Sequence, residues 1–541
     1  MSGSLRNYEI DHLLFENDEE DQAFDASSSE EEDHISNKSS SDSEVDMEDT
    51  EEMSRQEEDT DGNVFFGKDK KYVWKKNPNR PNVRTRSENI MTFLSGVKGL
   101  AKNAKTPFEC FSLFIDEAML EEILLCTNIK IRMARENKSS SNEYAYTEIT
   151  SSELKAVLGL LLLAGLFRSN RQCLKDLWAS DGTGIDIFRL TMSLRRFRFI
   201  INNLRFDDVN TREVRKNIDK LASIRNLFKN FIQNCQKHYE PSEYLTIDEE
   251  LVAFRGLQPD GPYKLSNKPF HVVDRLVMPV SKTSRNITMD NWFSSHELFE
   301  HLLKNHKLTA VGTLRANKTC IPPTFKAQRC VHSSIFGFQK DLTILSYVPK
   351  PKKNVFMLSS LHHDSEIDPQ SGPKNKPSII TFYNSTKGGV DVVDKLCRGY
   401  DVSRNSKRWP LTVFFQILNT AGVNSMVIHA LNCQLKAPTR SKFIKQLGLS
   451  LLQEQLSSRK ENERLPTLLR KRIAKHLGCD EIEPVRKMPN SRRRCTFCIR
   501  NKDRKTSNVC EECSRPICME HAKLVCAECL ISRSQILSEE D

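Results

Sequence analysis

Two aspartates, Asp248 and Asp290, each end a short run of β-branched and aliphatic residues, in the segments YLTID and NITMD. Such runs predict strands. An ionised carboxylate at the end of a buried strand is costly unless it is paired or binds a metal ion. The pattern therefore predicts a sheet that gathers acidic side chains where its strands end.

A third acidic position follows in the segment KGGVDVVDKL. Asp391 and Asp394 are three residues apart in an expected helix, so both would lie on one helix face. We prefer Asp391 as the third ligand and keep Asp394 as the alternative. Three carboxylates can hold two Mg²⁺ ions, which activate the attacking oxygen and stabilise the leaving oxygen in phosphodiester cleavage. The sequence thus predicts a protein that cuts or joins nucleic acid.

Charge is distributed very unevenly along the 541 residues. Residues 1–62 contain 23 Asp and Glu against three Lys and Arg, so the net charge of +9 conceals a body of +29. The acidic arm is rich in Ser and poor in aromatic residues, which predicts disorder. The basic body is expected to bind polyanions through counterion release. Residues 63–105 are interpreted as a basic, poorly structured linker.

Helical periodicity predominates from about Thr106 to Tyr239. The most apolar stretch, Ala156–Phe167, is too short to cross a bilayer and is expected to be a buried helix, with a capping box at Thr150 and Glu153. The N-terminus lacks the pattern of a signal peptide. Four arginines in this region either contact phosphates or form a solvated helix face: Arg195, Arg196, Arg198 and Arg205.

Several segments in order along the chain resemble those of piggyBac-family transposases. They include TIDEELVAFRG, RNITMDNWFSS, LTAVGTLRANK, YNSTKGGVDVVDKL and SRNSKRWP, together with a Cys/His array at the C-terminus. The resemblance implies an α+β multidomain protein with an RNase H-like, retroviral-integrase-like catalytic core. It also implies homodimeric cut-and-paste DNA transposition at TTAA targets, with Mg²⁺ held by Asp248, Asp290 and Asp391.

The expected domains follow from this resemblance and from the patterns above. A helical dimerisation and DNA-binding domain occupies residues 106–243 and 401–480, and the catalytic core occupies 244–315 and 380–400. An insertion domain is expected at 316–379 and a Cys-rich zinc-binding domain at 490–531.

Two basic segments are candidates for DNA contact. By resemblance, Arg315 and Lys318 of GTLRANK would touch DNA, although a solvated loop is the alternative. The segment SRNSKRWP combines cations with an aromatic ring, a mixture suited to backbone contact and base stacking; its candidates are Arg404, Lys407, Arg408 and Trp409.

Eight Cys and His residues near the C-terminus occur as four close pairs, the ligand number that two tetrahedral Zn²⁺ ions require. They are Cys495, Cys498, Cys510, Cys513, Cys518, His521, Cys526 and Cys529. We expect interleaved sites, with Cys495, Cys498, Cys518 and His521 on one ion, while sequential pairing stays an alternative. The other nine Cys are scattered, as in reduced intracellular proteins.

The zinc module is interpreted as binding DNA ends, because basic residues surround it. The same residues are a candidate nuclear localisation signal: Arg492, Arg493, Arg494, Lys502, Arg504 and Lys505. A ubiquitin-ligase or histone-tail-reading module is the alternative, although the ligand order matches neither usual pattern.

One feature departs from the family. Only 41 residues separate Asp248 from Asp290, and they show one helix pattern but no strand pair. The join at Pro269 and Phe270 suggests a lost segment with two strands of the core. Their loss is expected to deprive the Asp248 strand of its ladder partner and to displace Asp248. Two functions therefore stay open: an active transposase, or a domesticated nuclear DNA-binding protein without nuclease activity.

Overall fold

The computed structural model describes residues 62–78, 94–136, 147–249, 266–433, 438–479, 492–502, 504–510 and 515–522. The predicted acidic arm, apart from Gly62, lies outside these residues. The chain divides into two compact units. The first unit comprises residues 1–141, 162–171 and 204–447, and the second comprises 142–161, 172–203 and 448–541.

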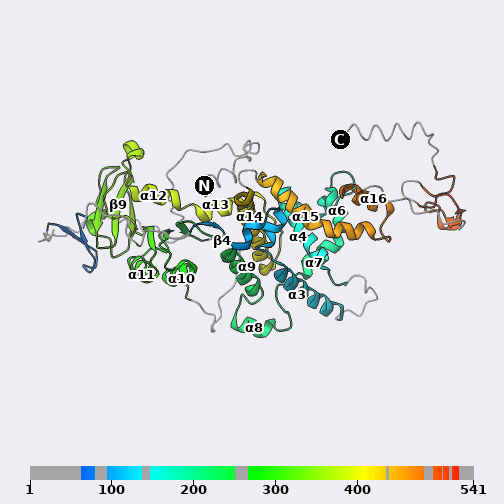
Figure 1. Cartoon of the computed structure of the whole chain (residues 1–541), viewed down its shortest axis with the longest axis horizontal. Coiled ribbons are helices and arrows are strands. Elements are labelled where there is room, and N and C mark those ends of the chain that lie inside the picture. Colours follow the sequence, from blue (N-terminus) through cyan, green and yellow to red (C-terminus); the bar gives the residue numbers. More distant parts are fainter. Residues whose placement is uncertain are drawn as a thin grey trace. The chain divides into compact units, whose positions relative to one another are not determined.

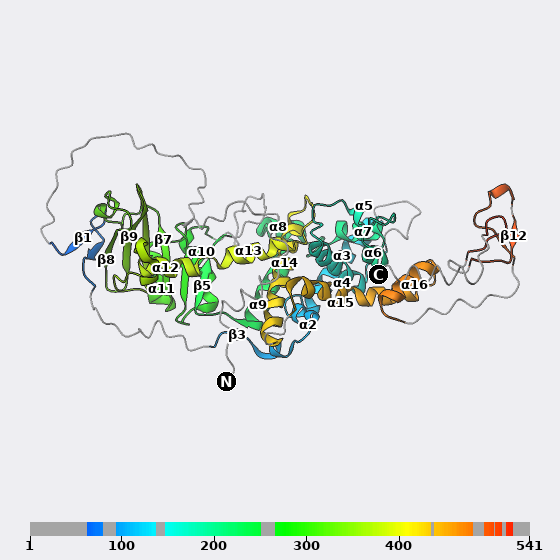
Figure 2. The same ribbon diagram turned by 90° about the horizontal axis from the view of Figure 1, so that it is seen from above.

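The first unit contains a mixed sheet of eight strands in the order β1-β2-β8-β9-β10-β7-β6-β5. These strands are β1 Val64–Phe66, β2 Val73–Lys75, β5 Tyr244–Ile247, β6 Asn286–Met289, β7 Thr309–Leu314, β8 Ser334–Phe338, β9 Thr343–Lys350 and β10 Lys353–Ser359. The neighbours β5, β6 and β7 are parallel, and the other pairs are antiparallel. Figure 2 shows β1 at one end of the sheet and β5 at the other.

Helices cover both faces of this sheet because its strands alternate apolar side chains between the faces. On one face, Ile344 and Phe356 pack with α10 (Pro269–Val277) and α11 (His296–His306). On the other face, Leu345 and Met357 pack against α12 (Ser378–Thr386). Figure 1 shows α10 and α11 on one side of the strands and α12 on the opposite side.

The predicted loss of a ladder partner for the Asp248 strand is wrong on one side only, because β5 pairs with β6 but lies at the edge of the described sheet. β5 pairs in parallel with β6 over four residues, from Tyr244 opposite Asn286 to Ile247 opposite Met289. A parallel pair needs a crossover of a dozen or more residues, and the stretch between Ile247 and Asn286 is long enough to include α10. The short spacing therefore still places the two aspartates on neighbouring strands.

The prediction that residues 63–105 form a poorly structured linker is also wrong for its first part. β1 and β2 form an antiparallel pair that joins the sheet at β8. Trp74 is fully buried, and its indole Nε1 donates to the Cys320 carbonyl at 2.9 Å. The Tyr72 hydroxyl donates to Glu297 at 2.6 Å. In a strand only alternate side chains face the core, so the lysines around these residues can point to solvent. Their number made the segment look like a basic linker rather than a pair of strands.

The expected insertion domain at 316–379 is not a separate body. Its strands β8, β9 and β10 continue the sheet, since β10 pairs antiparallel with β7 from Phe356 opposite Leu314 to Ser359 opposite Val311. Long-range pairing of this kind leaves no local mark in the sequence.

The remainder of the first unit is mostly helical. Its helices are α2 Pro107–Ser112, α3 Glu117–Glu136, α8 Arg212–Ile218, α9 Arg225–His238, α13 Gly389–Gly399 and α14 Trp409–Cys433, with a small strand pair of β3 Gly96–Val97 and β4 Tyr239–Glu240. Among the described helices, α14 is long and apolar enough to cross a membrane, but 61% of its most apolar window is buried within the protein. A buried core helix has the same composition.

The second unit is built around the predicted apolar helix. Its helices are α4 Ser151–Leu166, α5 Leu174–Leu177, α6 Asp186–Thr191, α7 Leu194–Asn203, α15 Arg440–Glu461 and α16 Thr467–His476, followed by the short strands β11 Arg493–Arg494 and β12 Lys505–Thr506. Two of these helices cross the unit boundary: α4 ends in the first unit, and α15 begins there. The capping box is confirmed, because Thr150 and Glu153 exchange hydrogen bonds of 3.2 Å. Gly159 lets α4 approach α15 closely, since a Cβ there would lie 2.7 Å from the Gly448 carbonyl oxygen.

Candidate active site

The ends of β5 and β6 bring Asp248 and Asp290 together. Carboxylate oxygens of Asp248, Glu249 and Asp290 all lie within 4.8 Å of one another. Burial raises the pKa of Asp290, and the negative charge of Asp248 adds to this shift. The pKa of Glu249 is raised by burial and by its hydrogen bond to Asp248. Such mutual repulsion is relieved when a cation binds, so the donor set fits a hard divalent metal ion.

A turn after β6 fixes the Asp290 side chain. Its Oδ1 accepts the backbone N–H of Trp292 at 2.8 Å and, less closely, that of Phe293 at 3.4 Å. The Ser294 hydroxyl donates to the Asp290 carbonyl oxygen at 2.7 Å. Asp290 is thus held by this turn where it lines the pocket.

The third predicted position, Asp391, lies in the first turn of α13 and lines the same pocket of about 490 Å³. Asp394 lines this pocket too, but its carboxylate pairs with Arg398 at 3.5 Å. Burial raises the pKa of Tyr383 to about 12, and the charges of Asp290, Asp248 and Asp391 add to the shift. Asp391 is not among the carboxylates whose oxygens lie within 4.8 Å of one another, so the shared pocket is what links it to Asp248 and Asp290.

The second of the two glycines before Asp391 has a packing role, whereas nothing lies within 4 Å of a Cβ on Gly388. A Cβ on Gly389 would lie 2.9 Å from the Thr246 hydroxyl, so only glycine lets α13 begin this close to β5. The Thr246 hydroxyl donates to the Thr386 carbonyl at 2.6 Å, and the Thr288 and Thr386 hydroxyls are 2.8 Å apart. These contacts hold the start of α13 against the strands that carry Asp248 and Asp290.

Gly312 on β7 gives the first testable prediction. A Cβ there would lie 2.3 Å from the Ser294 hydroxyl and 2.8 Å from the Met289 carbonyl oxygen. We expect Gly312→Ala to lower the free energy of unfolding by about 1–3 kcal/mol, because overpacking forces the strands apart. Chemical denaturation followed by circular dichroism measures this change.

Gly422→Ala on α14 is the matched control, because nothing lies within 4 Å of a Cβ there. It should leave stability unchanged or raise it by up to about 1 kcal/mol through helix propensity. Equal stability of the two alanine variants would contradict the close packing at Gly312.

A basic pocket adjoins the acidic one. Arg315 lines both pockets, and Lys318 and Trp292 line the basic one, whose volume is about 410 Å³. Trp292 is 37% exposed, although it lies in the turn that follows the buried strand β6. Trp292 and Glu249 were not predicted as site residues, although each lies within two residues of a predicted aspartate.

The predicted DNA contacts after α13 fall into two groups. Arg404 Nη1 donates to the carbonyls of Ser169 and Asn170, and Arg408 Nη2 donates to the carbonyl of Leu204. Burial lowers the pKa of both guanidinium groups. These two arginines therefore make hydrogen bonds inside the first unit, and their assignment as DNA contacts stays a prediction. Lys407 is exposed and Trp409 is half-buried at the start of α14.

The four arginines of the first helical segment divide similarly. Arg196 pairs with Glu153 at 2.7 Å and donates to two backbone carbonyls, so its role is structural. Arg205 donates to the Leu204 carbonyl at 2.8 Å, and burial lowers its pKa to about 10. Arg195 and Arg198 are exposed on α7 and stay candidates for phosphate contact.

A second group of residues that could hold a metal ion has the composition Cys₃His. The ligand atoms of Cys495, Cys498, Cys518 and His521 lie within 4.8 Å of one another, which is the first of the two predicted ligand sets. The Cys498 and Cys518 sulfurs are 3.6 Å apart, and His521 Nδ1 lies 3.3 to 3.7 Å from the three sulfurs. Tetrahedral Zn²⁺ bonds would place sulfurs about 3.7 Å apart and sulfur about 3.6 Å from nitrogen.

The second predicted ligand set is largely outside the described residues. Cys513, Cys526 and Cys529 lie there, and Cys510 is half-buried and donates its N–H to the Arg515 carbonyl. Of the basic residues near the cluster, Arg504 pairs with Glu520, while exposed positions include Arg492, Arg493, Arg494, Lys502 and Lys505.

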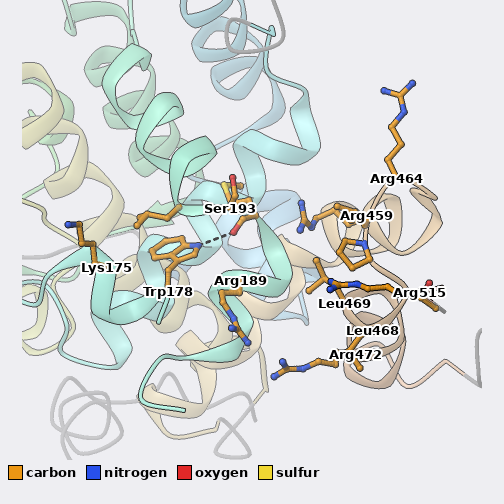
Figure 3. A pocket seen from close by; sticks show the side chains of 15 residues that line it. Lys175, Trp178, Arg189, Ser193, Arg459, Arg464, Leu468, Leu469, Arg472 and Arg515 are labelled. Atoms are coloured by element: carbon orange, nitrogen blue, oxygen red, sulfur yellow. Dashed lines mark hydrogen bonds between the residues drawn. The ribbon is translucent and has the colours of Figure 1, made fainter. Parts of the chain in front are cut away.

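The second unit contains a cationic groove of about 1020 Å³ that the sequence analysis missed. Figure 3 shows Lys175, Trp178 and Arg189 on one side and Arg459, Arg464 and Arg472 on the other. The side from α15 and α16 is held in place because Arg459 donates to the Leu190 carbonyl at 2.8 Å and Arg472 pairs with Asp186. These cations come from distant segments, so no local motif marks the groove.

Residues 106–269 and 257–426 match the family model described as Transposase IS4. A solved piggyBac transposase, in a synaptic complex with hairpin DNA, is 30% identical and has a TM-score of 0.71; the match covers 81% of this chain and all of that chain. This chain belongs to the piggyBac transposase family. The family membership expected from the sequence motifs is therefore confirmed.

Human relatives in the piggyBac family are more distant. PiggyBac transposable element-derived protein 3 is 27% identical over 28% of this chain and 23% of its own length. PiggyBac transposable element-derived protein 2 is 21% identical over 62% of this chain and 64% of its own length. The chain thus spans less than two thirds of either human relative.

The match to the family model consists of two segments that overlap at residues 257–269. The first segment ends at Pro269, next to the join where the sequence predicts a lost segment.

Proposed function

We propose that this chain is a piggyBac-type DNA transposase with an RNase H-like core, which cleaves and transfers DNA strands at TTAA sites with two Mg²⁺ ions. The observation that carries the proposal is the placement of Asp248 and Asp290 on adjacent parallel strands, with Asp391 lining the same pocket. The relative solved with hairpin DNA supports DNA as the substrate.

The residues around the pocket have distinct proposed roles. Asp248, Asp290 and Asp391 hold the Mg²⁺ ions, which supply Lewis-acid activation of the attacking and leaving oxygens. The turn at Trp292 keeps Asp290 oriented toward the pocket. Arg315, which lines the acidic and basic pockets, would position a phosphate beside the carboxylates.

We assign the remaining contacts to DNA binding. The exposed cations of the groove in the second unit suit the DNA backbone, because a polyanion releases counterions there. The Cys/His cluster would hold Zn²⁺ and fold the C-terminal module around it. The exposed basic residues beside that cluster would direct the protein to the nucleus, and a homodimer would hold the two transposon ends.

A domesticated, non-catalytic DNA-binding protein is the second candidate. It is favoured by the short spacing between Asp248 and Asp290 and by relatives named as element-derived proteins. The full chain is tested with Mg²⁺ on linear DNA that carries the sequences flanking its gene next to TTAA. Nicking and strand transfer support the transposase, while zinc-dependent binding without cleavage supports the second candidate.

Trp292 gives a prediction about single-stranded DNA. An exposed indole beside Arg315 and Lys318 is suited to stack on an unpaired base. We expect Trp292→Ala to weaken binding of a single-stranded oligonucleotide by about fivefold to 150-fold, equivalent to a stacking loss of about 1–3 kcal/mol. Fluorescence anisotropy at a fixed salt concentration measures the affinity.

The control removes another exposed aromatic ring of the first unit. Phe228 on α9 is 43% exposed and lies in neither pocket lined by Trp292, so Phe228→Ala should bind as the wild type does. An unchanged affinity of Trp292→Ala would show that this ring does not stack on DNA.

A further inference from the structure

Two histidines and one aspartate converge between α10 and α11, away from the pocket described above. Asp274 Oδ1 lies 2.7 Å from His301 Nε2 and 2.9 Å from His306 Nε2. Asp274 belongs to α10, whereas both histidines belong to α11, where His306 is close to the C-terminal end. The three ligand atoms all lie within 4.8 Å of one another.

The donor set is that of a transition-metal site. Two imidazole nitrogens and one carboxylate oxygen bind Zn²⁺ and similar ions, and they leave coordination positions open for water. The same set is poor for Mg²⁺, which prefers oxygen ligands. This chemistry distinguishes the cluster from the all-carboxylate pocket, and its lack of thiols distinguishes it from the Cys/His module.

Neighbouring side chains orient the two rings for binding through Nε2. His306 Nδ1 lies 2.9 Å from the Ser281 hydroxyl, and His301 Nδ1 lies 2.8 Å from the Asn305 amide. A neutral histidine that binds metal through Nε2 carries its proton on Nδ1, where such a partner accepts it. For His301, the Asn305 amide would turn to present its oxygen.

Exposure of the cluster suits exchange with solvent. The His306 side chain is 9% exposed, His301 24% and Asp274 36%. His306 therefore forms the buried wall, while the Asp274 side leaves an entry path for an ion and for the waters that complete its coordination.

The present distances are those of hydrogen bonds, and binding needs a small expansion. Tetrahedral bonds of about 2.05 Å place ligand atoms roughly 3.3 Å apart. Each histidine nitrogen would move from Asp274 by about half an ångström, which side-chain rotation on two separate helices can provide. Without an ion, the same residues form a hydrogen-bonded His–Asp–His triad.

We propose that Asp274, His301 and His306 form a Zn²⁺-class metal site that clamps α10 to α11. Because α10 lies between β5 and β6 in the chain, a bound ion would fasten the helix that leads from one of these paired strands to the other. The clamp is structural, since neither helix contributes a lining residue other than Pro269 to the described pockets beside Asp290.

The test compares metal content of full-length variants. Chelator-treated wild type, a His301→Gln/His306→Gln double variant and a His271→Gln control are loaded with Co²⁺ and washed. His271 lies on α10, is exposed and is absent from the cluster. We expect the double variant to bind one Co²⁺ fewer than the other two proteins, with unchanged thiolate-to-cobalt absorption.

Two further variants keep the result interpretable. Cys498→Ser should lose thiolate-to-cobalt absorption yet keep the ion lost from the double histidine variant. Ser281→Ala, which leaves all three ligands intact, should weaken Co²⁺ binding at this site by about tenfold through loss of the His306 partner. Equal Co²⁺ content in wild type and the double variant, or unchanged affinity in Ser281→Ala, would overturn the proposal.

Discussion

Asp290→Asn is expected to reduce Mg²⁺-dependent cleavage of TTAA-containing DNA by at least about a thousandfold, because losing about 4 kcal/mol of metal-based transition-state stabilisation has this effect. The substitution keeps the side chain's size and its Oδ1 acceptor for the Trp292 N–H. The fold should therefore persist, and DNA affinity should change little. Rates of product formation on end-labelled DNA, measured under single-turnover conditions, give the effect.

Asp391 and Asp394 provide the matched comparison for this prediction. Asp391→Asn should lose activity to a similar extent, whereas Asp394→Asn, whose carboxylate already pairs with Arg398, should lose less than about tenfold. Cleavage by Asp290→Asn at the wild-type rate would refute the assignment of the pocket. A larger loss in Asp394→Asn than in Asp391→Asn would exchange their roles.

Trp74→Ala is expected to lower the free energy of unfolding by about 3–5 kcal/mol, as for other large aromatic residues removed from a core. The side chain is fully buried against the sheet and α11, and its loss would leave the Cys320 carbonyl without its indole donor. Urea denaturation followed by circular dichroism measures the change.

The neighbouring strand residue is the control for the Trp74 result. Val73 is 42% exposed on β2, so Val73→Ala should cost less than about 1 kcal/mol. If the two variants unfold at the same urea concentration, residues 64–75 are not part of the sheet, and the original interpretation of this segment as a linker is restored.

Local patterns predicted the elements of the site better than their assembly. The apolar run before Asp290 identifies β6, and the Thr150 capping box identifies the start of α4. Both patterns are readable because each is formed by residues that are close together in the sequence. Gly389 was visible as a helix start, but its contact with Thr246 depends on a residue 143 positions earlier. No local pattern indicates which strand this glycine approaches.

The strand pairing shows why a missing segment was misjudged. From the sequence, the short spacing between Asp248 and Asp290 implied a strand without a partner. In the structure, β5 pairs directly with β6, since the remaining chain still accommodates a crossover with α10. Hydrogen bonding between strands depends on where the chain returns, which residue spacing alone does not determine.

By itself, the sequence determined the family, and it named two aspartates and four Cys/His residues whose ligand atoms lie close together in the structure. Only the tertiary structure decided the burial of Trp74, the interior roles of Arg404 and Arg408, and the meeting of Asp274 with two histidines. A sequence motif shows only the chemistry of residues that are close together along the chain. Burial, ion pairing and convergence of distant side chains arise from long-range packing, which a local pattern does not encode.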